Sequence, residues 1–286
     1  MYTFDVLSPE TLQEALEFKN TRKNTVSILV GGTDLLVGHR NGKKPVRTAL
    51  NLWHIKELGK ITWDQKGVHI GATVTYDAVI RDPKMNEKFP SFAEAAKTVG
   101  SVQIRNMATI VGNVCNASPA ADSTPLLYCA NATVTVRSLK QEKEIPIESF
   151  IIGPGAITLP DDSLVISVNI PDVSSLVGGQ LSLRQRIPLS INKVSFSVLL
   201  KRKDTDYIED IRMALGAVAP TVIRVKNAEE YIKGRKITPD VIKHVGKLCS
   251  QVSKPITDVR SNIDYRKAMC GVLAERLLKK LLESNS

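Results

Sequence analysis

The chain has 286 residues, of which 43% are hydrophobic and 24% charged. This composition is typical of a soluble globular protein and excludes disordered and collagen-like chains, and the length favours two domains. The net charge of +10 permits a nucleic-acid partner, but Lys and Arg are scattered and only 5% of the residues are aromatic. We therefore expect no nucleic-acid binding.

Cysteines and the N-terminus narrow the class further. The four cysteines, at positions 115, 129, 249 and 270, include no C-x-x-C pair. We expect neither a disulfide framework nor a metal site in this chain. The first residues, MYTFDVLSPE, lack the basic and apolar regions of a secretory signal. No apolar run reaches the roughly 18 to 20 residues of a membrane span, so the predicted location is the cytoplasm.

The first hundred residues predict a mixed series of short elements. Strand candidates are apolar or β-branched runs at residues 2–6, 26–30 and 49–52, with a hairpin at 61–75. A helix is predicted after Ser8, with Ser8 as N-cap and Pro9 in the first turn. Further helical segments are predicted at residues 34–39, 76–81 and 91–99, the last opened by a capping box from Ser91 to Glu94.

The remainder predicts strands first and helices last. Strands are predicted at residues 133–137, 144–146, 164–170, 180–186, 193–201 and 208–217, and helices at 122–130, 228–233, 239–253 and 263–282. Residues 172–180 contain Ser and Gly pairs and are predicted to be a linker, with a domain boundary near residue 176. The last helix has an apolar stripe that we assign to the core rather than to a subunit contact: Tyr265, Met269, Val272, Leu273 and Leu281.

Two segments are unusually rich in small residues. One is Val30-Gly31-Gly32-Thr33-Asp34, and the other is GSVQIRNMATIVGNVCNASPAADSTPLL at residues 100–127. Small residues let a backbone approach a ligand closely, and backbone N–H groups in such loops bind phosphates. Neither segment has the G-x-G-x-x-G pattern of a Rossmann fold, so we do not predict that fold.

Both segments resemble those of the flavin-binding medium subunits of molybdenum hydroxylases, the xanthine dehydrogenase and carbon monoxide dehydrogenase type of enzyme. Residues 30–35, VGGTDL, are similar to the family's A-G-G-T-D-L loop. Residues 102–113, VQIRNMATIVGN, followed by NASPAAD at 116–122, are similar to its second loop. LGAVAPT at 215–221 and DYR at 264–266 resemble motifs of its second domain, so the resemblance runs the whole length in order.

The resemblance implies an α+β fold in two parts. Residues 1–176 would form a two-subdomain FAD-binding domain of the vanillyl-alcohol-oxidase or PCMH type, divided at about residue 58. Residues 177–286 would form a smaller C-terminal domain of antiparallel sheet plus helices.

FAD is the cofactor that the resemblance implies, with its pyrophosphate bound by residues 30–34 and 109–113. Asp122 matches a family aspartate that contacts the flavin nucleotide; from the residues alone it is equally an N-cap for the helix that follows, and one side chain can do both. The implied cofactor-binding residues are Ile28, Leu29, Val30, Gly31, Gly32, Thr33, Asp34, Leu35, Thr109, Ile110, Val111, Gly112, Asn113, Asp122, Ile166 and Arg184.

This sequence departs from the family pattern at two positions. Val111 stands where the family has Gly, so it either costs about 1–2 kcal/mol at a positive φ or narrows the pocket. Ser182 aligns with a family Lys that reaches the flavin. Arg184, two residues further along the same strand face, is predicted to replace that Lys.

An electron-transfer subunit is the implied function, with no catalytic acid, base or nucleophile and no metal in this chain. Electrons would come from [2Fe–2S] clusters of a small partner subunit and pass through FAD to NAD⁺ or another acceptor. A large molybdopterin subunit would hydroxylate the substrate, in a dimer of heterotrimers. The alternatives are a stand-alone flavin oxidase, for which no catalytic residues are visible, and a scaffold that has lost FAD, motivated by Val111 and Ser182.

Overall fold

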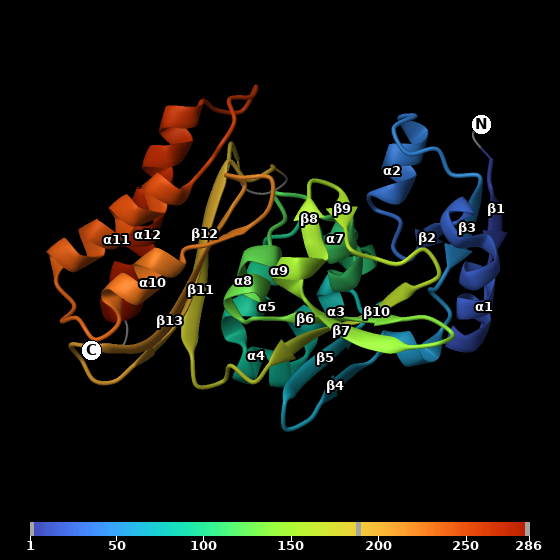
Figure 1. The fold of residues 1–286 in the computed structure, drawn as a ribbon, viewed down its shortest axis with the longest axis horizontal. Coiled ribbons are helices and arrows are strands. Elements are labelled where there is room, and N and C mark those ends of the chain that lie inside the picture. The colour runs from blue at the N-terminus through green and yellow to red at the C-terminus, as the bar shows by residue number, and fades with distance from the viewer. Residues whose placement is uncertain (1–2, 187–189, 284–286) are drawn as a thin grey trace. The chain divides into compact units, whose positions relative to one another are not determined.

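The computed structural model describes residues 3–186 and 190–283. They form two compact units, each of which contains helices and sheet (Figure 1). Unit 1 comprises residues 1–81, 101–117 and 132–171, and unit 2 comprises residues 82–100, 118–131 and 172–286. Two segments that precede the predicted boundary at residue 176 therefore fold with the C-terminal part of the chain.

Unit 1 begins with a small parallel sheet. Its strand order is β1 (Asp5–Leu7), β3 (Thr48–Asn51) and β2 (Ser27–Leu29). Helix α1 (Leu12–Arg22) joins β1 to β2, and helix α2 (Leu35–Arg40) follows β2. The loop of residues 30–34 therefore leaves the sheet at the end of a parallel strand and enters a helix.

The start of α1 differs from the prediction. Its N-cap is Thr11, not Ser8, and the Thr11 hydroxyl accepts a hydrogen bond from the Glu14 N–H at 3.2 Å. The residues Thr11 to Glu14 carry the Thr-x-x-Glu capping signal. That signal outweighs the Ser-Pro pair just upstream.

A larger antiparallel sheet forms the rest of unit 1. Its order is β4 (Ile61–Trp63), β5 (Gly67–Gly71), β10 (Leu164–Pro171), β6 (Thr133–Arg137) and β7 (Glu142–Pro146). The predicted hairpin is confirmed, but its second strand ends at Gly71 and not at residue 75. Around the sheet lie α3 (Tyr76–Arg81), α6 (Val102–Met107), α7 (Ile110–Asn116), α9 (Ile147–Phe150) and the strand pair β8 (Ile151–Gly153) and β9 (Ala156–Ile157).

Unit 2 is built on a second antiparallel sheet, of order β11 (Val177–Leu183), β12 (Val194–Arg202), β13 (Ile208–Gly216) and β14 (Ile223–Arg224). Helices α10 (Lys226–Ile232), α11 (Pro239–Val252) and α12 (Ile263–Glu283) cover one face, where Phe196 and Val198 enter the core (Figure 1). Helices α5 (Pro90–Lys97) and α8 (Thr124–Cys129) also pack against this sheet, and α4 (Pro83–Lys88) packs on α5.

The predicted linker is partly a strand, because β11 begins at Val177. A Cβ on Gly178 would lie 2.4 Å from a Leu199 methyl group and 2.5 Å from the Val198 carbonyl oxygen. This glycine is therefore explained by close packing against β12 and not by chain flexibility.

Two helix predictions need correction. The capping box at Ser91 is wrong, because α5 begins at Pro90 and Ser91 is buried in its first turn. The predicted core stripe on α12 is confirmed in part: Leu273 is in the core and Met269 and Leu281 pack against it, but Tyr265 is 45% exposed. The buried face of α12 consists of Arg266, Cys270, Gly271, Leu273, Ala274, Leu277 and Leu278.

No helix of residues 3–186 and 190–283 is long and apolar enough to cross a membrane. Among the same residues, no group of three or more His, Cys, Asp or Glu side chains could hold a metal ion. All four cysteines are free thiols.

Candidate functional site

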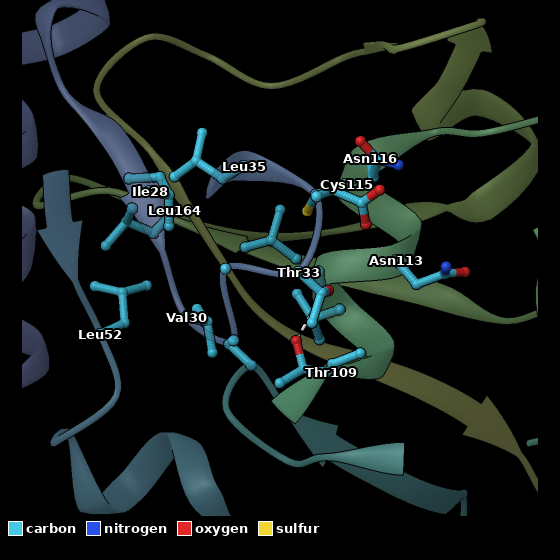
Figure 2. A pocket seen from close by; sticks show the side chains of 18 of the residues that line it. Ile28, Val30, Thr33, Leu35, Leu52, Thr109, Asn113, Cys115, Asn116 and Leu164 are labelled. Atoms are coloured by element: carbon cyan, nitrogen blue, oxygen red, sulfur yellow. Dashed lines mark hydrogen bonds between the residues drawn. The ribbon is translucent and has the colours of Figure 1, made fainter. Parts of the chain in front are cut away.

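A pocket of about 270 Å³ lies in unit 1, and both predicted glycine-containing segments line it. In Figure 2 the apolar side chains Ile28, Leu52 and Leu164 lie on one side and helix α7 lies on the other, with the Thr33 loop between them. The remaining apolar lining comes from Val30, Leu35, Ala72, Ala108, Val111, Ile157, Leu159 and Val165. The structure thus brings the two segments into one site.

The two glycines of the first loop are required for different reasons. A Cβ on Gly31 would lie 1.8 Å from the Met107 carbonyl oxygen, so only glycine lets this loop touch the end of α6. Gly32 has a φ of +68°, a conformation that side-chain-bearing residues rarely adopt. The loop shape therefore depends on both residues.

The second segment is the first turn of a helix and not an irregular loop. Thr109 is the N-cap of α7, and its hydroxyl accepts a hydrogen bond from the Gly112 N–H at 3.0 Å. A Cβ on Gly112 would lie 2.9 Å from that hydroxyl, so glycine leaves room for the cap. The predicted residues 109–113 therefore present a helix N-terminus to the pocket.

Backbone N–H groups without partners converge on this pocket. Within the described part of the chain, the N–H groups of Gly31, Gly32, Thr33 and Asp34 donate no hydrogen bond, and neither does that of Val111 in the first turn of α7. Free N–H donors and the positive end of a helix dipole together favour an anion. The pocket has the donor set that a phosphate group requires.

Val111 causes no backbone strain. It lies inside α7 with helical geometry and is absent from the residues of positive φ among those described. The first of the two consequences predicted for this position is therefore wrong. Its side chain is buried and lines the pocket, so the second consequence, a narrower pocket, stays a prediction.

Ten lining residues were not predicted from the sequence, and three of them carry a polar group or a thiol: Lys44, Cys115 and Asn116. Lys44 reaches across Gly38, whose absent side chain leaves space for the Lys44 methylene groups, and its Nζ donates to Asn116 Oδ1 at 3.3 Å. Burial raises the pKa of the Cys115 thiol to about 12, so the thiol is protonated at neutral pH. Recognition of α7 as a helix would have placed Cys115 on the face of Val111, four residues earlier.

Three predicted residues lie beside the pocket and not in its lining. Leu29 ends β2, and Ile110 is fully buried in α7. Ile166 occupies an irregularity between Val165 and Ser167 of β10, and its carbonyl oxygen accepts a hydrogen bond from the Ala72 N–H at 2.9 Å.

Asp122 belongs to unit 2, where it does not cap α8. The N-cap residue of α8 is Ser123, and no side chain caps it. Asp122 Oδ1 instead lies 2.5 Å from Arg184 Nη2 and accepts a hydrogen bond from Asn192 Nδ2 at 2.8 Å. Burial raises the pKa of the Asp122 carboxyl above its usual value, against the opposing effects of Arg184 and Asn192.

Arg184 follows β11, and its side chain is only 6% exposed. Its Nη1 donates to the Thr98 carbonyl oxygen at 3.0 Å, so both terminal nitrogens have protein partners. Ser182 lies in β11 opposite Ser195 of β12.

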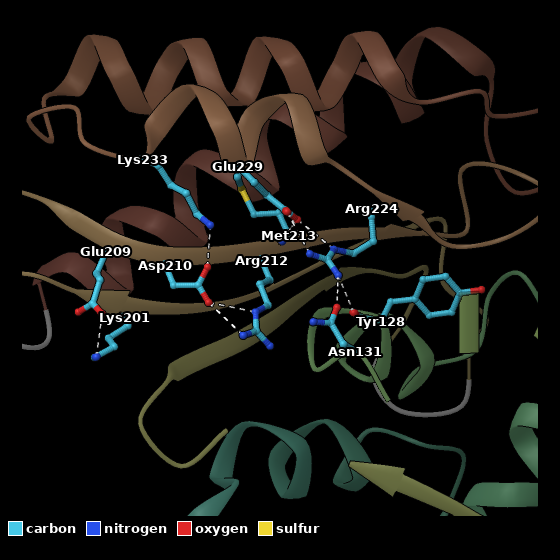
Figure 3. A network of polar contacts seen from close by, with 10 residues as sticks. All are labelled: Tyr128, Asn131, Lys201, Glu209, Asp210, Arg212, Met213, Arg224, Glu229 and Lys233. Carbon is cyan, nitrogen blue, oxygen red and sulfur yellow. Dashed lines mark hydrogen bonds and ion pairs between the residues drawn. The ribbon is translucent and has the colours of Figure 1, made fainter. Parts of the chain in front are cut away.

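A second arginine holds the other end of α8 (Figure 3). Arg224 Nη1 donates to the Tyr128 carbonyl oxygen at 2.9 Å and to Asn131 Oδ1 at 2.7 Å. The same guanidinium makes two 3.0 Å contacts with the Glu229 carboxylate, which also accepts a hydrogen bond from the Met213 N–H. Residues 118–131 are thus fixed to the C-terminal sheet at both ends.

Two protein families match this chain in order. The family described as the FAD binding domain in molybdopterin dehydrogenase matches residues 2–173. The chain belongs to this family. The family described as the CO dehydrogenase flavoprotein C-terminal domain matches residues 180–281 of the same flavoprotein.

Relatives of known name are similar over nearly the whole flavoprotein. The glyceraldehyde dehydrogenase medium chain of Sulfolobus acidocaldarius is 27% identical, covering 97% of this chain and 98% of the relative. The xanthine dehydrogenase FAD-binding subunit of Escherichia coli O157:H7 is 25% identical, covering 88% and 87%. The structure of carbon monoxide dehydrogenase from Hydrogenophaga pseudoflava superposes with a TM-score of 0.92 at 24% identity, covering 96% of each chain.

These matches confirm the α+β fold and the assignment to the FAD-binding subunits of the molybdenum hydroxylase type. The pocket fits the family cofactor on physical grounds. It offers free N–H donors for a pyrophosphate and apolar walls for a ring system.

Proposed function

We propose that this flavoprotein is the electron-transfer subunit of a molybdenum hydroxylase complex. It would hold FAD between a partner that carries [2Fe–2S] clusters and a terminal acceptor, NAD⁺ or another oxidant. The observation that carries the proposal is the convergence of two glycine-containing segments, with their free N–H groups, on one pocket.

The backbone of this chain would bind the pyrophosphate. The N–H groups of residues 31–34 and that of Val111 are the available donors. A hydrogen bond to a charged group contributes about 1.5–3 kcal/mol, so a few of them suffice for tight binding. Ile28, Leu52 and Leu164 would exclude water from the part of the cofactor that they contact. FAD itself supplies the redox chemistry when bound.

The pocket lining supports electron transfer over a stand-alone oxidase. A flavin oxidase needs an acid, base or nucleophile beside its substrate. Among the described lining residues, the charged side chains of Lys44 and Asp34 are exposed, and the thiol of Cys115 is protonated at neutral pH because burial raises its pKa to about 12. Substrate chemistry would therefore belong to a partner chain.

The partners would be a large molybdopterin subunit and a small [2Fe–2S] subunit, in a dimer of heterotrimers. Relatives with the names "medium chain" and "FAD-binding subunit" favour a complex with other subunits. Co-purification with neighbouring chains, followed by analysis for molybdenum and iron, tests it.

Gly32→Val tests the proposed cofactor site. We expect this variant to lose FAD while its circular dichroism stays that of the wild type. Gly155→Val is the matched control, because Gly155 has the same φ of +68° but open space around it and no place in the pocket. Normal FAD occupancy in Gly32→Val would show that the pyrophosphate is bound elsewhere. A wild-type chain that cannot be loaded with FAD would favour the scaffold alternative.

A further inference from the structure

The 256–265 turn of unit 2, which joins α11 to α12, exposes apolar side chains. Four large ones in this short segment are exposed: Ile256, Val259, Ile263 and Tyr265. Val259 is fully exposed, and Ile256 is 67% exposed. Single exposed apolar residues are common on protein surfaces and need no explanation, but four within ten residues indicate an interaction surface.

Hydrogen bonds inside the turn fix its shape. The Asp258 N–H donates to the Ser261 carbonyl oxygen at 3.1 Å, and the Ser261 N–H donates back at 3.2 Å. Val259 and Arg260 therefore form the tip. Asp258 Oδ1 accepts hydrogen bonds from the Arg260 N–H at 2.8 Å and from Arg266 Nη2 at 2.7 Å.

The base of the turn is attached to the body of unit 2. Arg266 is only 4% exposed, and its Nη1 donates to the Ala217 carbonyl oxygen at 3.3 Å. On the other side of the turn, the Lys254 N–H donates to the Val218 carbonyl oxygen at 2.9 Å. Polar groups thus hold the turn from within while apolar groups face outward. A surface that is fixed in this way loses little conformational entropy when a partner covers it.

The charges beside the turn indicate the chemistry of the partner. Lys254 lies two residues before Ile256, and Lys267 lies on the same face of α12 as Ile263, four residues earlier. Both lysines are exposed, and neither forms an ion pair with the residues that the structure describes. The exposed acid of the segment, Asp264, lies in the first turn of α12, where the helix dipole stabilises it. The apolar surface is therefore bordered by free cations.

We propose that the 256–265 turn binds a partner chain of the complex, in an apolar pocket with Asp or Glu side chains at its rim. This inference rests on the proposed function, which places the chain in a heteromeric complex. A second copy of the chain fits poorly, because two cationic surfaces would meet and each chain has a net charge of +10. A turn of fixed shape also fits a matching protein pocket better than a fluid lipid surface.

The first experiment purifies the tagged full-length chain from cells that make the whole complex and measures molybdenum and iron per chain. Val259→Asp should lower both at least about tenfold, because a carboxylate would be buried in an apolar contact. Its folding should be unchanged, since Val259 is fully exposed. Ile152→Asp is the matched control, because Ile152 is 63% exposed and belongs to unit 1. It should retain both metals.

Two further measurements test the chemistry of the partner. Lys254→Glu combined with Lys267→Glu should weaken the complex about fivefold at low salt, and the difference should shrink at high salt. Benzoylphenylalanine in place of Val259 should crosslink on illumination to another chain of the complex. The crosslinked peptide should contain Asp or Glu.

Three outcomes would overturn the inference. They are wild-type metal content in Val259→Asp, a crosslink to a second copy of this chain, and Val259-dependent binding of the purified chain to vesicles of phosphatidylcholine and phosphatidylserine. FAD content, measured on the same samples, tests the cofactor site separately. A wild-type chain that carries FAD but brings down neither metal would contradict the proposed complex together with this inference.

Discussion

The pocket of unit 1 and the 118–131 segment of unit 2 use opposite chemistry. The pocket presents backbone N–H groups that have no partner within the described residues, and it has few charged side chains. In the segment and the sheet that supports it, Asp122, Arg184, Arg224 and Glu229 are paired with one another. The groups that we propose bind the cofactor are left free, whereas the groups that support the fold are satisfied.

This difference determines how each region can be damaged. Among the standard residues only proline lacks a backbone N–H donor, so the pocket is sensitive mainly to changes of the glycines that set the loop shape. One member of a charged pair can be removed by substitution. The partner then stays buried without a counter-charge, which lowers the stability of the fold. Substitutions in the pocket should therefore change FAD binding most, and substitutions in the network should change stability most.

Arg224→Met should have the largest effect on stability. Arg224 and Glu229 are 9% and 10% exposed, and loss of one partner from a buried pair costs about 3–5 kcal/mol. Urea unfolding monitored by circular dichroism measures this loss. Arg212→Met, in a pair that is 25% and 28% exposed, is the control and should cost less than about 1 kcal/mol. Equal losses in the two variants would contradict a structural role for the Arg224 network.

Gly31→Ala should combine a stability loss with a loss of FAD. The new Cβ would lie 1.8 Å from the Met107 carbonyl oxygen, and backbone atoms cannot move aside easily. We expect a loss of about 3 kcal/mol and a displaced loop. Gly153→Ala in the same unit is the control, since its Cβ would meet Ala156 at an ordinary 3.7 Å. FAD binding to Gly31→Ala with wild-type affinity would contradict the predicted site.

Val111→Gly should change stability more than FAD affinity. The pocket donor at this position is the backbone N–H, which glycine retains, whereas a buried side chain is lost from a helix. The expected loss is about 2 kcal/mol, with FAD affinity within about threefold of the wild type. Val111→Ala also removes most of the buried side chain but keeps a good helix former. Its stability therefore separates the contribution of burial from that of helix propensity. FAD binding that tightens tenfold or more would show that the side chain obstructs the cofactor.

Lys44→Met should have the smallest effect. Lys44 and Asp34 are the charged side chains among the described lining residues, and both are exposed. Loss of this cation should weaken FAD binding about two- to fivefold at low salt, and the difference should vanish at high salt. Lys43→Met, next to it but outside the lining, should bind FAD normally. An equal effect of both substitutions would mean that only net charge matters.

Local patterns predicted many of the elements. Alternating β-branched residues gave β6 with its observed bounds, and residues 76–81 form α3 as expected. The two glycine-containing segments were recognised from the sequence, and both line the pocket. They could be recognised because their backbone shapes require glycine. These features depend on residues that are close together in the sequence, so they can be predicted from one sequence alone.

Features that depend on distant partners were missed or misassigned. Gly178 was predicted to be a linker residue. Glycine is required there because the backbone packs closely against β12, about twenty residues away in the sequence. The pairing of Arg184 with Asp122 was missed, because it depends on packing that no local pattern records. Helix α7 was concealed because its Gly and Asn residues are poor helix formers, and a Thr cap compensates for them.

The most direct test of the central claim is the cofactor content of the purified full-length chain. After denaturation, the supernatant is analysed for released flavin, and a colourless preparation is first incubated with FAD and desalted. The account predicts about one FAD per chain. A chain that carries no flavin and takes up none on incubation would contradict it.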